Sequence, residues 1–224
     1  MQTYQTQFIE FMVRAGVLTF GDFVTKSGRS TPYFINTGNY RSGAQLAQLG
    51  QFYAAAITQH FGDSFDNLYG PAYKGIPLAV TASIALTQQH HRDVSVTYNR
   101  KEIKDHGERG SLIGHQYKGS ENVLIIEDVI TAGTSIRESL AILNAHNRPN
   151  VVGVLVAVDR REKGQADLSA IDEVKRQFNL PVIPIVDVHN IIAHLHNRPL
   201  EGRILIDDTM KQKMQAYLTQ YGCS

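Results

Sequence analysis

The stretch from Asn122 to Arg137 constrains this chain most, reading Asn-Val-Leu-Ile-Ile-Glu-Asp-Val-Ile-Thr-Ala-Gly-Thr-Ser-Ile-Arg. Its first part, Val123 to Ile126, is a continuous apolar run, which is typical of a strand buried on both faces of a parallel sheet. Its last part predicts a helix, because the N-cap residue types Thr134 and Ser135 precede apolar side chains at helical spacing. In an open α/β sheet, ligands bind where the carboxyl end of such a strand leads into a helix.

The short segment between this strand and this helix carries the chemistry. Its loop amides and the positive end of the helix suit a phosphate group, and Gly133 lets the backbone approach it closely. Glu127 and Asp128 would repel a bare phosphate unless sugar hydroxyls or a bridging Mg²⁺ engage them. Phosphoribosyl pyrophosphate offers a phosphate, a vicinal diol and metal-bound phosphates, so it satisfies every group. Each residue taken singly is explained as a cap or a solvated side chain, but the ordered set is not.

Length and composition predict a single α/β domain over residues 1–224, with enough chain for a substantial core. The formal net charge of +1 indicates no nucleic-acid or membrane surface, so any attraction for anions must be local. Cys223 is the sole cysteine, which excludes an intrachain disulfide and a thiolate metal cluster. The sequence has no signal-peptide pattern and no apolar run of membrane-spanning length, so we expect a cytoplasmic protein.

Strand and helix patterns alternate along the chain. Apolar periodicity predicts helices over residues 3–15, 42–60, 76–90, 168–178, 188–195 and 209–221, besides the one that opens near 134. Strands are predicted near residue 68 and over 94–98, 123–126, 150–158 and 181–186. Two strand-like pieces flank the polar turn Lys26-Ser-Gly-Arg29, which by itself indicates a hairpin with a solvated basic tip. The alternation favours a mostly parallel sheet between helices.

Val123 to Ser135 resembles the signature of the type I phosphoribosyltransferases: an apolar strand, an acidic pair, two apolar residues and Thr-x-Gly-Thr. That family often has Asp where this chain has Glu127, a change that leaves a role in binding the ribose diol possible. The resemblance implies a central sheet flanked by helices and a small N-terminal hood formed mainly by about residues 1–40. It also implies that Asp128 is catalytic. The implied binding site for phosphoribosyl pyrophosphate comprises Glu127, Asp128, Val129, Ile130, Thr131, Ala132, Gly133, Thr134 and Ser135.

The N-terminal hairpin narrows the resemblance to the orotate phosphoribosyltransferases. Lys26-Ser-Gly-Arg-Ser-Thr-Pro-Tyr-Phe34 is similar to the hood sequence of that family. The similarity implies that Lys26 reaches the pyrophosphate and that Phe34 and Ile35 present backbone groups to the pyrimidine. The family more often has Phe at the second of these positions, so Ile35 weakens a stacking role there but not a main-chain one.

Two loops extend the resemblance. Gly70 to Gly75 is by itself an ordinary strand–helix turn, yet Tyr73 and Lys74 match the pair that contacts pyrophosphate in the family. Residues 99–110 are highly charged, lack an apolar stripe and end in glycines, which predicts a solvated mobile loop suited to act as a lid. Their Arg-Lys-x-x-Lys-x-His-Gly pattern matches the family's catalytic loop. The match implies closure over the neighbouring subunit of a homodimer. It also implies that Arg100, Lys101, Lys104 and His106 bind phosphoribosyl pyrophosphate and that the last three are catalytic.

Arg160 follows the strand predicted over residues 150–158. An arginine there can bind a planar carboxylate through two parallel hydrogen bonds, but the residues by themselves favour a surface arginine among other charges. The family places an arginine for the substrate carboxylate after this strand, which implies that Arg160, with Thr131, orients orotate; Arg161 is the weaker candidate. Three histidines lack acidic or cysteine partners at metal-ligand spacing, and we interpret them as surface or capping groups: His189, His194 and His196.

The resemblance implies transfer of ribose 5-phosphate from phosphoribosyl pyrophosphate to orotate, giving orotidine 5′-monophosphate and pyrophosphate in pyrimidine nucleotide synthesis. Breaking the bond at ribose C1 leaves positive charge on the sugar and negative charge on the leaving group, so positioning and electrostatic stabilisation suffice. We expect Mg²⁺ to be carried by the pyrophosphate without direct protein ligands, and His106 to have either a charge-balancing or a structural role. Two alternatives are a purine-specific transferase, disfavoured by the hood and Arg160, and a non-enzymatic nucleotide sensor, disfavoured by the complete lid pattern.

Overall fold

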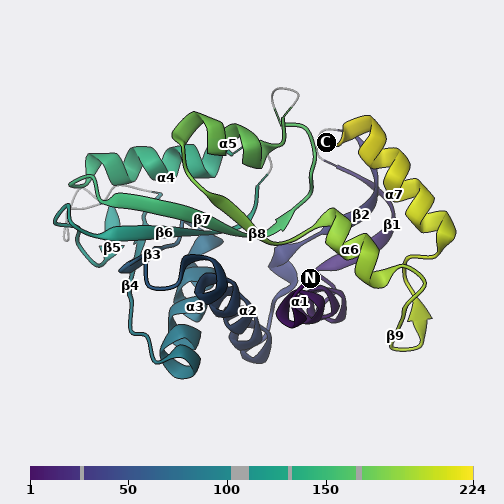
Figure 1. Cartoon of the computed structure of the whole chain (residues 1–224), viewed down its shortest axis with the longest axis horizontal. Helices are drawn as coiled ribbons and strands as arrows, with labels where there is room; N and C mark the ends of the chain where they lie inside the picture. The colour runs from purple at the N-terminus through teal and green to yellow at the C-terminus, as the bar shows by residue number, and fades with distance from the viewer. Residues whose placement is uncertain (26–27, 102–110, 131–132, 165–167, 224) are drawn as a thin grey trace.

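A computed structural model describes residues 1–25, 28–101, 111–130, 133–164 and 168–223 (Figure 1). Within these residues a six-stranded sheet runs in the order β5-β4-β3-β6-β7-β8. Its parallel strands are β3 (Asn67–Tyr69), β4 (Ser95–Asn99), β6 (Asn122–Val129), β7 (Asn150–Asp159) and β8 (Val182–Asp187). The edge strand β5 (Leu112–Gly114) pairs antiparallel with β4. The predicted α/β fold with a mostly parallel sheet is confirmed.

Helices cover both faces of the sheet. Figure 1 shows α2 (Gly43–Phe61) and α3 (Gly75–His90) on one face, and α4 (Thr134–Ala145) and α5 (Ala170–Phe178) on the other. The residues of β6 alternate between the two resulting cores: Leu124 and Ile126 pack with α2 and α3, whereas Val123 and Ile125 pack on the opposite side. Burial on both faces explains why this strand is apolar throughout rather than alternating. All helices of the described part fall short of the length and apolar character needed to cross a bilayer.

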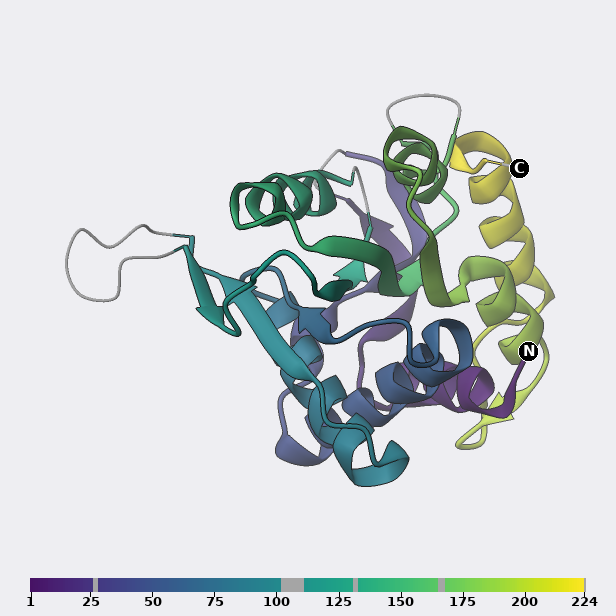
Figure 2. The same cartoon turned by 60° about the vertical axis from the view of Figure 1, so that its left-hand side comes forward.

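The hood is built from both ends of the chain. Helix α1 (Thr3–Arg14) leads into the antiparallel hairpin of β1 (Leu18–Val24) and β2 (Ser30–Ile35), followed by the short helix η1 (Thr37–Asn39). In Figures 1 and 2 the C-terminal helix α7 (Asp208–Tyr221) lies beside this hairpin, and α6 (Val188–Leu195) lies between α7 and the sheet. A two-strand hairpin, β9 (Pro199–Leu200) and β10 (Arg203–Ile204), connects α6 to α7. The N-terminal hairpin is therefore backed by residues distant in sequence.

The start of α4 differs from its prediction. The expected N-cap residues Thr134 and Ser135 are the first two residues of the helix, and Gly133 is the N-cap with a φ of 68°. The prediction is wrong because the chain turns into the helix through a left-handed conformation, which glycine adopts without strain. The other predicted helices begin and end within two residues of their observed bounds.

Of the three histidines interpreted as surface or capping groups, His189 is exposed and His196 is half-buried with Nε2 2.8 Å from Asp208 Oδ1. His194 is buried, and its Nε2 lies 3.1 Å from Glu10 Oε1 on α1. The interpretation is therefore wrong for His194, which joins α6 to α1. A helix periodicity read from α6 alone does not reveal a partner so far away in sequence.

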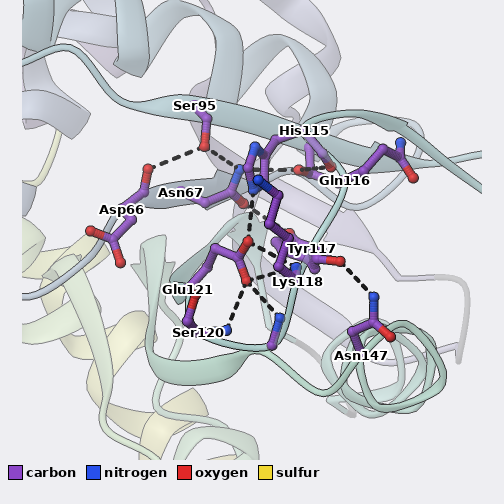
Figure 3. Close-up of polar contacts among 12 residues, drawn as sticks. Asp66, Asn67, Ser95, His115, Gln116, Tyr117, Lys118, Ser120, Glu121 and Asn147 are labelled. Carbon is purple, nitrogen blue, oxygen red and sulfur yellow. Dashed lines mark hydrogen bonds and ion pairs between the residues drawn. The ribbon is translucent and has the colours of Figure 1, made fainter.

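A polar network closes the sheet at the amino ends of β3, β4 and β6 (Figure 3). The two oxygens of the Glu121 carboxylate accept the backbone amide of Lys118 at 2.9 and 3.0 Å, and Oε1 lies 3.0 Å from His115 Nε2. Tyr117 donates to Asn67 Oδ1 at 2.8 Å, so the buried amide side chain is satisfied. Burial by itself would raise the pKa of Glu121, but the hydrogen bonds from His115 and the backbone lower it to about 2. The network fixes the segment that leaves β5.

Candidate active site

The parallel strands end at the edge of the sheet opposite this network, and the polar loops meet there. β6 ends in the acidic pair, β3 leads into the loop from Gly70, β4 leads into Arg100, and β7 leads into Arg160. In an open α/β sheet this edge is the usual position of a ligand site. Most of the site residues predicted from sequence lie on these four connections.

Asp128 lies at the centre of the site and is 8% exposed. Its Oδ2 accepts hydrogen bonds from Thr37 Oγ1 at 2.7 Å and from Lys74 Nζ at 2.9 Å, and Lys74 also lies 3.1 Å from Thr37 Oγ1. Burial opposes ionisation of Asp128, but the hydrogen bonds from Lys74 and Thr37 outweigh it and lower its pKa. Sequence reasoning missed Thr37, for which the Asn36-Thr-Gly turn after the hood strand was the sole local signal.

Glu127, the neighbouring acid, has a different environment. Its Oε1 accepts the Asp128 amide at 3.0 Å and its Oε2 accepts the Ser135 hydroxyl. Burial raises the pKa of Glu127 to about 7, against the effect of these hydrogen bonds. Its backbone carbonyl accepts the hydroxyl of the fully buried Tyr53 at 2.7 Å, so α2 fixes the end of β6. The pair thus joins an ionised carboxylate to one that titrates near neutral pH.

The described part of the connection from β6 to α4 has features that suit an anion. Gly133 has a left-handed φ of 68°, and a Cβ there would lie 2.7 Å from Val174 Cγ2, so a larger residue is excluded. Thr134 and Ser135 are exposed in the first turn of α4, where amide groups and the helix dipole favour an anion. Val129 and Ile130 lead into this turn, whereas the predicted residues Thr131 and Ala132 lie outside the described residues.

The loop after β3 brings Lys74 to Asp128. The Ala72 amide donates to Asn99 Oδ1 at 2.9 Å, which ties this loop to the end of β4. Tyr73 is 65% exposed, and Lys101 Nζ lies 4.9 Å from the centre of its ring. The Arg100 amide donates to the Ser111 carbonyl at 2.8 Å, which joins both ends of the charged segment. The predicted residues Lys26, Lys104 and His106 lie outside the described part of the chain.

The hood and the end of β7 form the other side of the site. On β2, Phe34 is 39% exposed and contacts Phe23 with ring centroids 5.7 Å apart, while Ile35 is half-buried opposite Leu18. Arg160 has a side-chain exposure of 11%, and its guanidinium lies 4.6 Å from the centre of the Tyr33 ring. The hood residues and Arg160 are thus linked through Tyr33.

The two arginines after β7 have different partners. Arg160 Nε donates to Glu162 Oε1 at 2.8 Å. Arg161 lies between two carboxylates, 3.3 Å from Asp159 Oδ2 and 3.2 Å from Asp187 Oδ2, which holds it against the ends of β7 and β8. Arg161 is therefore engaged in joining the two strands. Glu162 was not predicted from sequence, where it read as one charge among several.

Comparison with known proteins gives consistent matches. A family model described as a phosphoribosyl transferase domain matches residues 36–185. The chain is 51% identical over 222 residues to an orotate phosphoribosyltransferase of Clostridium beijerinckii, covering 99% of each sequence. It is 50% identical to one of Pectobacterium carotovorum, covering 99% of this chain and 100% of that protein. The crystal structure of the Francisella tularensis orotate phosphoribosyltransferase superposes with a TM-score of 0.83 at 37% identity, covering 96% of this chain and 99% of that one.

Proposed function

Because the chain belongs to the orotate phosphoribosyltransferases, within the phosphoribosyl transferase domain family, we propose that the carboxyl edge of its sheet is where the reaction takes place. The enzyme transfers ribose 5-phosphate from phosphoribosyl pyrophosphate to orotate in pyrimidine biosynthesis. The observation that carries the placement is the contact of Asp128 with Lys74, at 2.9 Å. Asp128, at the end of β6, is an acid suited to ribose hydroxyls. Lys74, in the loop after β3, is a cation suited to pyrophosphate.

Asp128 and Glu127 hold the ribose hydroxyls in this proposal, and Asp128 also faces the positive charge that develops on the sugar. Lys74 Nζ lies 2.9 Å from Asp128 Oδ2 and neutralises this carboxylate. When the diol takes its place on the carboxylate, the Lys74 ammonium is released to the pyrophosphate. The 5′-phosphate binds the amides and hydroxyls of the loop and first turn of α4, from Val129 to Ser135.

In this proposal, cationic and polar side chains of several loops stabilise the leaving pyrophosphate. These residues are Lys26, Tyr73, Lys74, Arg100, Lys101, Lys104 and His106. Mg²⁺ enters on the pyrophosphate, whose oxygens are the hard ligands that this ion prefers, and the acidic pair provides carboxylates beside it. When bound, the metal supplies Lewis-acid stabilisation of the departing charge. The protein residues position the sugar and the leaving group and exclude water.

Orotate is held between the hood and β7. Phe34 and Ile35 offer backbone groups, Thr131 orients the ring, and Arg160 binds the carboxylate. The position of Arg160 supports this role, because its guanidinium is nearly buried yet Nη2 has no directed hydrogen bond. Nη2 is paired with the Glu162 carboxylate at 2.6 Å, and the outer end of the guanidinium fork can bind a substrate carboxylate through parallel hydrogen bonds.

We also propose that the protein acts as a homodimer in the cytoplasm, each chain folding as one domain with its hood. Val80 and Ile84, one turn apart on α3, are 37% and 50% exposed, and Tyr73 lies near the start of the same helix. An exposed apolar stripe of this kind is typical of a protein interface. In the dimer the cationic segment 100–110 of one subunit serves the site of the other.

The experiment that tests the proposal follows the loss of orotate absorbance with phosphoribosyl pyrophosphate and Mg²⁺. Asp128→Asn and Lys74→Ala are compared with the unchanged enzyme, and adenine, hypoxanthine and nicotinate replace orotate in parallel. We expect consumption of orotate alone, abolished by a metal chelator and strongly reduced in both variants. Full activity of both variants would contradict the placement of the site, and consumption of another base would contradict the role of the hood and Arg160.

A further inference from the structure

Glu162, which the reaction scheme above does not use, lies at the centre of a largely buried polar cluster. Its Oε1 accepts hydrogen bonds from Arg160 Nε at 2.8 Å and from the Tyr217 hydroxyl at 2.8 Å, and Tyr33 Oη lies 3.4 Å away. Tyr33 and Tyr217 are 0% and 5% exposed, and their rings meet edge to face with centroids 6.0 Å apart. We call these four residues the Glu162 cluster. It joins the hood strand β2, the segment after β7 and the C-terminal helix α7.

The cluster determines which edge of the Arg160 guanidinium remains available to bind a substrate. Glu162 Oε1 lies against the Nε–Nη2 side, 2.8 Å from Nε and 2.6 Å from Nη2. The hydrogen bond is directed from Nε, whereas Nη2 is buried without a directed hydrogen bond. A guanidinium presents its five donors in a rigid fork, so fixing one side sets the direction of the other. The end formed by Nη1 and Nη2 is therefore oriented for a second carboxylate.

The backbone residues before and after Glu162 are hydrogen-bonded to the C-terminal segment. The Lys163 amide donates to the Tyr221 carbonyl at 2.9 Å, and the Cys223 amide donates to the Arg161 carbonyl at 2.9 Å. A β-bridge pairs Glu162 with Gly222. Because α7 both clamps the backbone here and supplies the Tyr217 hydroxyl, its placement determines the placement of Glu162.

We propose that Glu162, held by the Tyr217 hydroxyl, is a positioning residue that aims Arg160 at the carboxylate of orotate and thereby sets selectivity for this base. The inference rests on the proposed role of Arg160 in binding that carboxylate. Glu162 also neutralises Arg160, so recognition depends on the direction of the donor fork rather than on excess positive charge. A small displacement of Glu162 consequently weakens orotate binding without affecting phosphoribosyl pyrophosphate.

Tyr217→Phe tests the proposal, because it removes one hydroxyl and keeps the ring contacts. We expect the KM for orotate to rise about threefold to tenfold, as the loss of one net hydrogen bond implies, with the KM for phosphoribosyl pyrophosphate and the unfolding temperature nearly unchanged. Tyr221→Phe is the matched control: it lies one turn further along α7, and among the described residues its hydroxyl has no hydrogen bond. The proposal would be overturned if Tyr217→Phe raised the KM values for orotate and phosphoribosyl pyrophosphate equally. It would also be overturned if Tyr221→Phe raised the KM for orotate as much as Tyr217→Phe does.

A double-mutant cycle with Arg160→Lys shows whether Tyr217 acts through Arg160. Lysine keeps the charge but lacks the fork, so we expect a large rise in the KM for orotate and no further rise when Tyr217→Phe is added. If Arg160→Lys leaves the KM for orotate unchanged, the proposed function of Arg160 is wrong. If it raises that KM but the Tyr217 effect adds to it independently, the proposed function stands and the positioning role fails.

Glu162→Asp separates position from charge. The substitution keeps the carboxylate but withdraws it by one methylene from Arg160 and Tyr217. We expect a larger rise in the KM for orotate than Tyr217→Phe produces, since both contacts are lost at once. An unchanged KM would mean that the charge alone suffices, which would contradict a role in aiming the guanidinium.

Discussion

At the scale of single residues, the acidic pair shows how two adjacent carboxylates acquire different properties. Asp128 receives a lysine and a threonine from other loops, which favours its ionised form. Glu127 is itself buried and accepts the Ser135 hydroxyl, and the effect of burial on its pKa dominates. The ionised Asp128 suits the positive charge of the reacting sugar, whereas Glu127 links the ribose region to the first turn of α4.

Glu127→Gln should change how stability depends on pH. The folded-state pKa of about 7 lies above the reference value of 4.5, so the contribution of Glu127 to stability is present below pH 4.5 and lost as pH rises through 7. Glutamine does not ionise, so the variant does not lose this stability as the pH rises. We expect urea unfolding to find the variant more stable than the unchanged protein at pH 8, by up to about 3 kcal/mol, with little gain at pH 5. Equal differences at the two pH values would contradict the raised pKa.

Lys104→Ala tests the role assigned to the cationic segment. Lys104 lies outside the described residues, so its role rests on the sequence pattern. A group that stabilises the departing pyrophosphate acts in the transition state, and its removal should raise the barrier by about 3 kcal/mol. Steady-state kinetics should therefore show a fall in kcat much larger than the change in KM. Loss of substrate affinity at unchanged kcat would contradict the assignment, and Lys118→Ala, at the opposite edge of the sheet, serves as the control.

At the scale of elements, Gly133 determines how α4 begins. Its φ of 68° and the 2.7 Å approach of Val174 leave no room for a side chain. We expect Gly133→Ala to lower the free energy of unfolding by about 1–3 kcal/mol and to weaken binding of phosphoribosyl pyrophosphate, because the first-turn amides shift. Gly43→Ala, in the first turn of α2 with nothing within 4 Å, is the matched control and should be neutral or slightly stabilising. Denaturant unfolding and calorimetric titration would measure both quantities.

The network around Glu121 stabilises β5 and the segment behind it (Figure 3). The folded-state pKa of about 2 lies below the reference value of 4.5, so its contribution is present above pH 4.5 and lost as pH falls towards 2. Glu121→Gln should therefore cost about 1.5–3 kcal/mol at pH 7, and this deficit should shrink at pH 3.5. Urea midpoints at the two pH values measure it, with the exposed Glu138→Gln on α4 as control. A deficit independent of pH would indicate a packing effect instead.

Sequence patterns predicted the elements that bury their own apolar residues. The apolar run of β6 and the periodicity of α6 and α7 suffice, because each element carries its own signal. Three short strands were not predicted: β5 has three residues, and β9 and β10 have two each, so pairing in the folded chain defines them. The same limit applies to the site. Thr37 lies 91 residues from Asp128, and Tyr217 lies 55 from Glu162, so no local pattern reveals either contact.

At the scale of the whole molecule, the hood connects the two termini to the site. Tyr33 on β2 and Tyr217 on α7 meet over Glu162, and Thr37 extends from the hood to Asp128. In the proposed site, base recognition and ribose binding are thus linked to one structural unit made from both ends of the chain. The resemblance in sequence indicated an N-terminal hood, but the contribution of α7 emerges from the folded structure.

Subunit mixing tests whether the cationic segment serves the partner's site. Lys104→Ala disables the segment and keeps the ribose site, whereas Asp128→Asn does the reverse, so each homodimer should be nearly inactive. After unfolding and refolding as an equal mixture, half of the dimers contain one chain of each kind. If the segment acts across the interface, each such dimer has one intact site, and activity should recover to about a quarter of the unchanged enzyme. If the segment acts within its own chain, no site is intact and the mixture stays inactive, which would contradict the shared site. Each variant refolded alone provides the baseline.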